Sequence, residues 1–385
     1  MSNVKNVGKV DFASATDAER AEALAHAEEI QAPEESPPAA PPALSTPRSY
    51  TLADLDADRN RALLSLADLP DGHGWGSELD RMVGGGLGPG DVVGLGASAA
   101  GAGKTALVMQ LADGLALRSA DLAETAKGGP LTPMLLLSEM DPKALARRTL
   151  ARLAGAPAWF FRSGVAAERS RHRAEAATAY DKARALLQPG GAFQRLAAWQ
   201  RTARPTNRGA AMLGQVEKAV EDFKAEVKAR YPGRQVWPVV VIDPIQRWQS
   251  EGVSEVEALN ALAESVDALA DDHGWIVLLT SDTNKAAAVG REEKDRDPAN
   301  LFRGSYKLFH ACDLVLTSTA EPYVEGQAVR EVTVGIAKNR NGGMGSVSFG
   351  WEGATGRFTP RPPAPRPAPA AASSPAKGGA YDHRL

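Results

Sequence analysis

One stretch decides the fold: Val92–Thr105, which reads VVGLGASAAGAGKT. An apolar run leads into a loop of small residues, and the loop ends in Gly103, Lys104 and Thr105. Leucines four residues apart follow at positions 107, 111 and 115, which predicts a helix with one apolar face. A strand, a glycine-containing loop and a helix in this order are typical of a loop that binds phosphate groups.

The small residues of the loop suit this chemistry. They let backbone N–H groups approach phosphate oxygens, and the N-terminus of a helix favours negative charge. We expect the phosphates to be bound by Ser98, Ala99, Ala100, Gly101, Ala102, Gly103, Lys104 and Thr105. Lys104 would reach the β- and γ-phosphates, and the Thr105 hydroxyl would ligate Mg²⁺. The strict motif has glycine where this chain has Ser98, and the alternative interpretation is a Gly/Ala-rich turn that binds nothing.

Two further apolar runs end in a carboxylate. Met134–Ser138 is followed by Glu139, and Val239–Ile242 is followed by Asp243. Continuous apolar runs are typical of strands that are buried on both faces of a parallel sheet. Ligands of such sheets bind beyond the carboxyl ends of the strands, so both acids are placed for chemistry. Asp243 would hold Mg²⁺ through water. For Glu139 the alternative is an exposed acid without a role.

Composition limits the class of protein. The 385 residues are 43% hydrophobic, which is enough for a sizeable core in one large domain or two small ones. The net charge of −3 gives no overall basic surface, so any contact with nucleic acid must be local. The single cysteine, Cys312, excludes a disulfide framework. Neither a signal peptide nor an apolar run of about 18 residues is found, so we expect no membrane contact and a cytoplasmic protein.

The order of the patterns predicts an α/β fold with a mostly parallel central sheet flanked by helices. Residues 1–50 and 359–385 are rich in Pro and Ala, and we expect both tails to be disordered around one domain at 51–358. The N-terminal segment is then either a plain linker or a docking peptide. Within the domain, residues 155–208 have a helical composition, and a helix is expected from Leu52 to Leu69.

Four later stretches, in this order along the chain, resemble RecA-type hexameric helicases, most closely the C-terminal ATPase domain of the DnaB family. They are Leu136–Met140, Ile242–Gln246, Leu279–Lys285 and Ala337–Gly342. Their spacing agrees with the family from about Leu69 to Phe358. The resemblance implies a RecA-like P-loop NTPase, with ATP and Mg²⁺ at each subunit boundary of a homo-oligomeric ring, a hexamer in that family.

The resemblance also implies roles for individual residues. Glu139 would polarise the attacking water, with Lys104 and Asp243 on the phosphates and the metal. Lys338 and Arg340 would reach the γ-phosphate of the neighbouring subunit and stabilise charge in the transition state. The alternative for Arg340 is a solvated hairpin residue.

A charged segment between the last two motifs is the candidate DNA contact. The loop Ala286–Ser305 would face the ring channel and touch single-stranded DNA through Lys285, Arg303 and backbone amides. The alternative is a plain surface loop.

Two departures from the family pattern limit what the resemblance implies. Asp282 stands where the family usually has Gln at its γ-phosphate sensor. Residues 1–50 do not match the family's N-terminal helical domain, so a primase-type partnership is not implied. Three functions stay open: an ATP-dependent DNA helicase, a RecA/RadA-like DNA-binding ATPase that does not separate strands, and a regulatory ATPase with a protein client.

Overall fold

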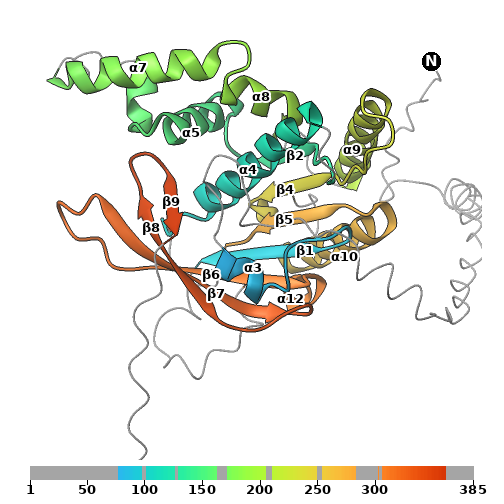
Figure 1. Cartoon of the computed structure of the whole chain (residues 1–385). Helices are drawn as coiled ribbons and strands as arrows, with labels where there is room; N and C mark the ends of the chain where they lie inside the picture. Colours follow the sequence, from blue (N-terminus) through green and yellow to red (C-terminus); the bar gives the residue numbers. More distant parts are fainter. Residues whose placement is uncertain are drawn as a thin grey trace, which may run out of the picture. The chain divides into compact units, whose positions relative to one another are not determined.

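A nine-stranded sheet organises the chain, with the strand order β3-β2-β4-β5-β1-β6-β7-β8-β9 (Figure 1). The computed structural model describes residues 77–97, 101–125, 129–162, 171–204, 210–248, 254–282, 302 and 306–360. These residues all belong to one compact unit, Ala62–Leu385. The expected helix at Leu52–Leu69, the N-terminal tail and nearly all of the C-terminal tail lie outside the described residues.

The first six strands in this order are parallel, and the last three are antiparallel. The parallel strands are β3 (Gln200–Ala203), β2 (Met134–Ser138), β4 (Val239–Asp243), β5 (Ile276–Thr280), β1 (Val92–Ala97) and β6 (Leu314–Ala320). The antiparallel strands are β7 (Val329–Asn339), β8 (Ser346–Glu352) and β9 (Arg357–Pro360). This confirms the mostly parallel sheet that the apolar runs predict. Strand β9 ends at Pro360, just past the boundary expected at Phe358.

Helices cover both faces of the sheet (Figure 1). They are α3 (Ser77–Met82), α4 (Lys104–Glu124), α5 (Pro142–Ala154), η1 (Ala158–Phe161), α7 (Arg173–Leu187), α8 (Ala192–Trp199), α9 (Ala210–Arg230), η2 (Ile245–Trp248), α10 (Glu255–His273) and α12 (Tyr306–Ala311). Alternate residues of a strand pack on opposite faces. Leu136 packs in the core that contains α4, and Leu137 packs in the core that contains α10. Such strands need apolar residues at every position, which is the pattern of β2, β4 and β5.

One strand differs from the sequence prediction. Gln200–Ala203 forms the edge strand β3, within a segment whose composition indicates only helix. Three of its four residues are polar and all are at least partly exposed, because an edge strand outside the main core does not need an apolar run. Hydrogen bonding to β2 fixes its position, and no local pattern of residues reports that pairing.

The register of the parallel strands brings their carboxyl ends to one edge. Ser138 pairs with Asp243, and Leu95 pairs with Thr280. The loop after β1, Glu139 after β2 and Ser281 after β5 therefore emerge side by side. This is the edge at which open α/β sheets bind ligands.

Candidate active site

The loop after β1 is shaped by two glycines in the left-handed region, Gly101 at φ 78° and Gly103 at φ 82°. A Cβ atom on Gly103 would also lie 2.7 Å from Phe358 Cζ, so both conformation and space require glycine there. Helix α4 begins at Lys104, and no side chain caps its first turn. Its free N–H groups suit an anion such as phosphate. Residues 98–100 of the expected phosphate loop lie outside the described residues.

Asp243, at the end of β4, is brought against the start of α4 as the sequence predicts. Its Oδ1 accepts hydrogen bonds from Thr280 Oγ1 at 2.5 Å and from Thr105 Oγ1 at 3.2 Å. Burial raises the pKa of Asp243, and these two hydrogen bonds lower it in part. A carboxylate held beside a hydroxyl oxygen in this way presents the hard oxygen ligands that Mg²⁺ prefers.

The described residues contain no cluster of three or more His, Cys, Asp or Glu side chains that could hold a metal ion. Thr105 and Asp243 alone are too few ligands for a protein-only site. This agrees with a Mg²⁺ that is bound by one or two protein groups together with phosphate oxygens and water. The residues present therefore fit a metal that arrives with a nucleotide.

Lys104 contacts the segment that follows β5. Its Nζ donates to the backbone carbonyl of Ser281 at 2.9 Å and lies 3.1 Å from Asp282 Oδ1. Gln246 braces the same segment, because its side chain bonds Ser281 Oγ at 2.7 Å and accepts from the Asp282 N–H at 3.1 Å. The expected phosphate-binding lysine is thus held by the residue at the expected sensor position.

Glu139 lies beside Asp243, with its N–H donating to the Asp243 carbonyl at 3.1 Å. Its carboxylate accepts a hydrogen bond from Arg247 Nε at 2.5 Å, and both side chains are partly exposed. Sequence reasoning did not assign Arg247 a role. Its place directly after the Asp243 strand, beside Gln246, was the available signal.

Lys338 and Arg340 are not brought to this edge of the sheet. Strand β7 runs antiparallel to β6, with Asn339 opposite Leu314, so both residues lie at the amino-terminal edge. Arg340 Nη1 lies 2.6 Å from Asp313 Oδ1. Lys338 Nζ donates to the carbonyls of Phe309, His310 and Cys312, and burial lowers its pKa. Within one subunit, the two residues therefore cannot complete the site at Lys104.

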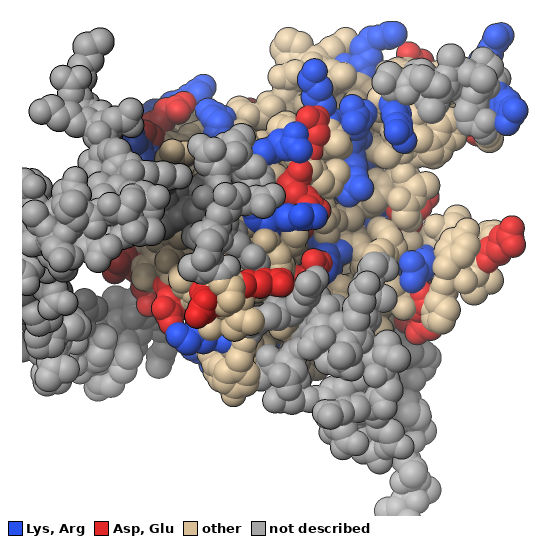
Figure 2. All heavy atoms as spheres, turned by 180° about the vertical axis from the view of Figure 1, so that it is seen from behind, with Lys and Arg blue, Asp and Glu red and all other residues tan. Residues whose placement is uncertain are grey.

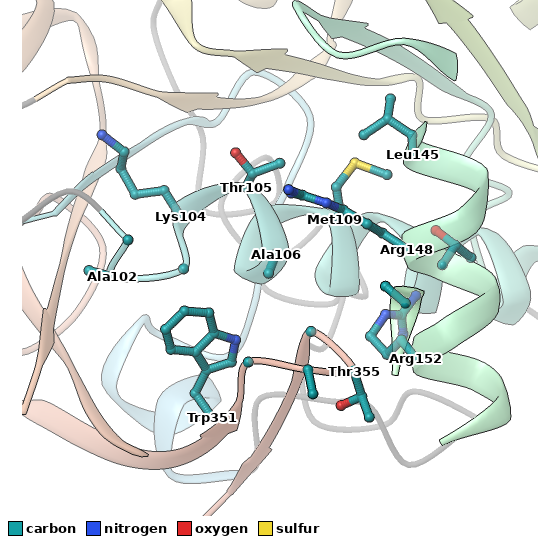
Figure 3. Close-up of a pocket in the computed structure, with 17 residues that line it drawn as sticks. Ala102, Lys104, Thr105, Ala106, Met109, Leu145, Arg148, Arg152, Trp351 and Thr355 are labelled. Carbon is teal, nitrogen blue, oxygen red and sulfur yellow. The ribbon is translucent and has the colours of Figure 1, made fainter. Parts of the chain in front are cut away.

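A cavity of about 420 Å³ continues from the phosphate loop along α4 (Figure 3). Its walls are α4, α5 and the turn between β8 and β9. Gln110 of α4 fixes this turn, because its side chain donates to the Phe358 carbonyl at 2.8 Å and accepts from the Phe358 N–H at 2.9 Å. Sequence reasoning missed Arg152, Trp351 and Thr355, which line the cavity.

The strand order, the loop before α4 and the positions of Glu139 and Asp243 are those of a nucleotide-binding site. A comparison with known families shows to which family the chain belongs. The sequence pattern of the DnaB-like helicase C terminal domain matches residues 75–360. The chain belongs to this DnaB-like helicase family. The family match covers all of the described strands, so the RecA-like sheet and its loop are the family's ATPase domain.

Solved structures share this fold. A solved ATPase domain matches with a TM-score of 0.57 and 18% identity, over 81% of this chain and 96% of that one. "The Structure Of A DnaB-Like Replicative Helicase And Its Interactions With Primase" matches with a TM-score of 0.59 and 17% identity, over 88% of this chain and 71% of that one. No curated protein matches the chain. None of the helices in the described ranges is long and apolar enough to cross a membrane.

Proposed function

We propose that the chain hydrolyses ATP with Mg²⁺ and, as a ring, uses the energy to separate DNA strands. One observation carries the proposal: Thr105 and Asp243 share a hydrogen bond of 3.2 Å at the start of α4, with Glu139 and Lys104 at the same edge of the sheet. Phosphoryl transfer needs positioned charges more than covalent groups, and this edge provides them.

Each residue has a distinct task in this account. The N–H groups at Gly101–Lys104 bind the phosphates, and Lys104 exchanges Asp282 for phosphate oxygens. Thr105 would ligate Mg²⁺, and Asp243 would hold the water molecules of the metal. The metal, when bound, neutralises developing charge. Glu139 leaves Arg247 and accepts a hydrogen bond from the attacking water, which orients that water toward the γ-phosphate.

The position of Lys338 and Arg340 supports a site that is shared between subunits. Both lie at the opposite edge of the sheet from Lys104 of the same subunit. Head-to-tail contacts generate closed rings, and we propose a ring in which that edge of one subunit faces the phosphate loop of the next. We therefore propose a homo-oligomer, a hexamer as in the family, in which Arg340 exchanges Asp313 for the neighbour's γ-phosphate.

Single-stranded DNA is the proposed partner. Apart from Phe302, the loop Ala286–Ser305 lies outside the described residues, as do Lys285 and Arg303, but it begins four residues after Asp282, which contacts Lys104. The residue that contacts the phosphate-binding lysine and the start of the loop are therefore close together in the sequence.

A basic surface is the second reason to propose DNA. Between residues 142 and 204, Lys and Arg far outnumber Asp and Glu. Figure 2 shows Lys and Arg gathered over the upper part of the face seen from behind. Such a local basic surface favours a phosphodiester backbone.

The second candidate is a RecA/RadA-like DNA-binding or regulatory ATPase that does not separate strands. Asp282 favours it, because an ionised carboxylate cannot donate a hydrogen bond to a γ-phosphate as the family's Gln can. Nucleotide state and DNA movement would then be less tightly coupled.

ATP-driven displacement of a labelled strand from a forked duplex tests the proposal, with Lys104→Ala as the control that lacks nucleotide chemistry. The helicase account expects displacement by the parent protein alone. ATP hydrolysis without displacement would instead support the second candidate.

A further inference from the structure

The helices beyond α4 carry an excess of positive charge that the rest of the chain does not share. Residues 142–204 contain acids only at Glu168, Glu175 and Asp181, whereas the whole chain has a net charge of −3. Helix α7 packs mainly on α5 and α8, on the side of these helices away from the sheet (Figure 1). Its outward side chains are therefore placed to contact a macromolecular partner.

One stripe of α7 combines basic and aromatic side chains. Arg173, Tyr180 and Arg184 are seven and four residues apart, a spacing that puts all three on the same side of the helix. All three are exposed. The buried residues of α7 lie on another stripe and are small: Ala176, Ala179 and Ala183.

Aromatic rings of η1 lie against this stripe. Phe161 is edge-on to Tyr180, with ring centroids 5.7 Å apart. Tyr180 Oη donates to the Phe160 carbonyl at 2.8 Å, which fixes the ring. An open groove of about 410 Å³ lies beside the two rings, and Arg184 belongs to its lining. We call the surface formed by Phe161, Arg162, Arg173, Tyr180 and Arg184 the outer seam.

The cations of the outer seam are available to a ligand. Within the described ranges, the side chains of Arg162 and Arg173 form neither an ion pair nor a hydrogen bond. Arg184 lies 3.4 Å from Asp181, and the two side chains are 73% and 74% exposed. Such an exposed pair contributes little to stability, so a phosphate group can replace Asp181. No residue of the outer seam lines the cavity along α4, so this surface is separate from the proposed nucleotide site.

The aromatic rings narrow the choice of partner. Arginines alone would suit any polyanion, but unpaired bases also stack on exposed aromatic rings while the backbone follows the positive charge. Tyr180 is 37% exposed, so part of its ring is open to a base. The bases of a duplex are already stacked on one another, and an acidic peptide has no bases to stack. The combination therefore favours a single strand.

We propose that the outer seam is a second binding site for single-stranded DNA, separate from the loop Ala286–Ser305. Arg162, Arg173 and Arg184 contact backbone phosphates, and a base stacks on Tyr180. The inference rests on the proposed function only in its choice of DNA as the partner. Binding at the outer seam requires neither a bound nucleotide nor ATP hydrolysis.

Fluorescence anisotropy of a labelled oligothymidine tests the inference, with the full chain at several salt concentrations and without nucleotide. The triple variant Arg162→Gln, Arg173→Gln, Arg184→Gln loses three phosphate contacts. The slope of log K against log salt should therefore become shallower by about 2. The matched control removes the same charge from exposed positions of α9 and should keep the slope of the parent: Lys218→Gln, Lys228→Gln, Arg230→Gln.

The aromatic contact has its own variants. Tyr180→Leu should weaken binding about tenfold, because a stacked base is lost, and should leave the salt slope unchanged, because stacking releases no counterions. Tyr180→Phe keeps the ring and should bind as the parent does. Lys285→Gln with Arg303→Gln removes the proposed loop contacts and should leave the seam's binding in place, whereas adding the triple variant should abolish it.

Three results overturn the inference. If the triple variant keeps the parent's salt slope, or if the α9 control loses as much, the outer seam does not contact DNA. If Tyr180→Leu binds normally, or if duplex DNA or polyglutamate competes as well as oligothymidine does, the seam is a general polyanion surface. If no form of the protein binds DNA while Lys104 remains necessary for ATP turnover, the DNA partner is wrong and the ATPase assignment stands.

Discussion

Lys104 Nζ lies 3.1 Å from Asp282 Oδ1, so the phosphate-binding lysine is paired with the residue at the sensor position. A nucleotide must displace Asp282 from Lys104 before its phosphates can be bound there. The proposed DNA loop begins four residues after Asp282, so this exchange would link nucleotide state to the start of that loop.

Asp282→Asn should therefore strengthen nucleotide binding. The pair is half exposed on the Asp282 side, and such pairs contribute up to about 1 kcal/mol, so we expect a gain of no more than about fivefold. Calorimetric titration with Mg²⁺–ATP measures the effect. A loss of affinity would instead mean that Asp282 contacts the metal or a nucleotide group.

Glu139→Gln should separate binding from chemistry. The amide keeps the size of the side chain but loses the charge that orients water, so ATP turnover should fall on the order of 100-fold at unchanged affinity. Glu226→Gln, an exposed acid on α9, serves as the control. Normal turnover in Glu139→Gln would make Glu139 a bystander.

Asp243→Asn should stabilise the free protein while abolishing Mg²⁺-dependent turnover. Burial raises the pKa of Asp243, so the folded state binds its proton more tightly than the unfolded state does. The free energy of unfolding therefore falls as the pH rises through that raised pKa.

The test is thermal unfolding over a range of pH without nucleotide. The Asp243→Asn side chain carries no charge at any pH, and its amide oxygen still accepts from Thr105 and Thr280. We expect a melting temperature a few degrees above the parent at neutral pH, with the difference shrinking as the pH is lowered below the usual range of an aspartate. A variant that melts below the parent at neutral pH would contradict the cause given for the pKa.

Arg340→Ala should be inactive alone and rescued by mixing. Loss of a charge-stabilising arginine supplied by a neighbour costs on the order of 1000-fold. Mixed with Lys104→Ala subunits, some interfaces pair an intact Lys104 with an intact Arg340, and part of the ATPase activity should return. Lys307→Ala, on nearby α12, should resemble the parent. If mixed assemblies form without recovery, Arg340 is structural, as its contact with Asp313 would allow.

The parts of the fold and site that the sequence predicts are those encoded by local patterns. The strands β1, β2, β4 and β5 are continuous apolar runs, and each of the last three is followed by a polar residue that reaches the site. These patterns were therefore sufficient to predict that Lys104, Thr105, Glu139 and Asp243 lie at the same edge of the sheet.

The features that the sequence did not predict depend on contacts between segments that are far apart in the chain. The edge strand β3 forms by pairing with β2, and its polar residues carry no strand signal. The cavity joins Arg152 of α5 to Trp351, about 200 residues later, through the pairing of β8 with β9. The resemblance already implies that Arg340 acts on a neighbouring subunit, but the pairing of β7 with β6 that puts it at the opposite edge of the sheet from Lys104 is a property of the topology.

Steady-state ATP turnover by the full chain, measured with and without single-stranded DNA and with Lys104→Ala as the blank, decides whether the chain is a DNA-stimulated ATPase. We predict turnover that Lys104→Ala abolishes and that single-stranded DNA increases severalfold. Turnover that is absent, or that is the same in Lys104→Ala, would contradict the ATPase assignment, and turnover that DNA leaves unchanged would contradict the helicase.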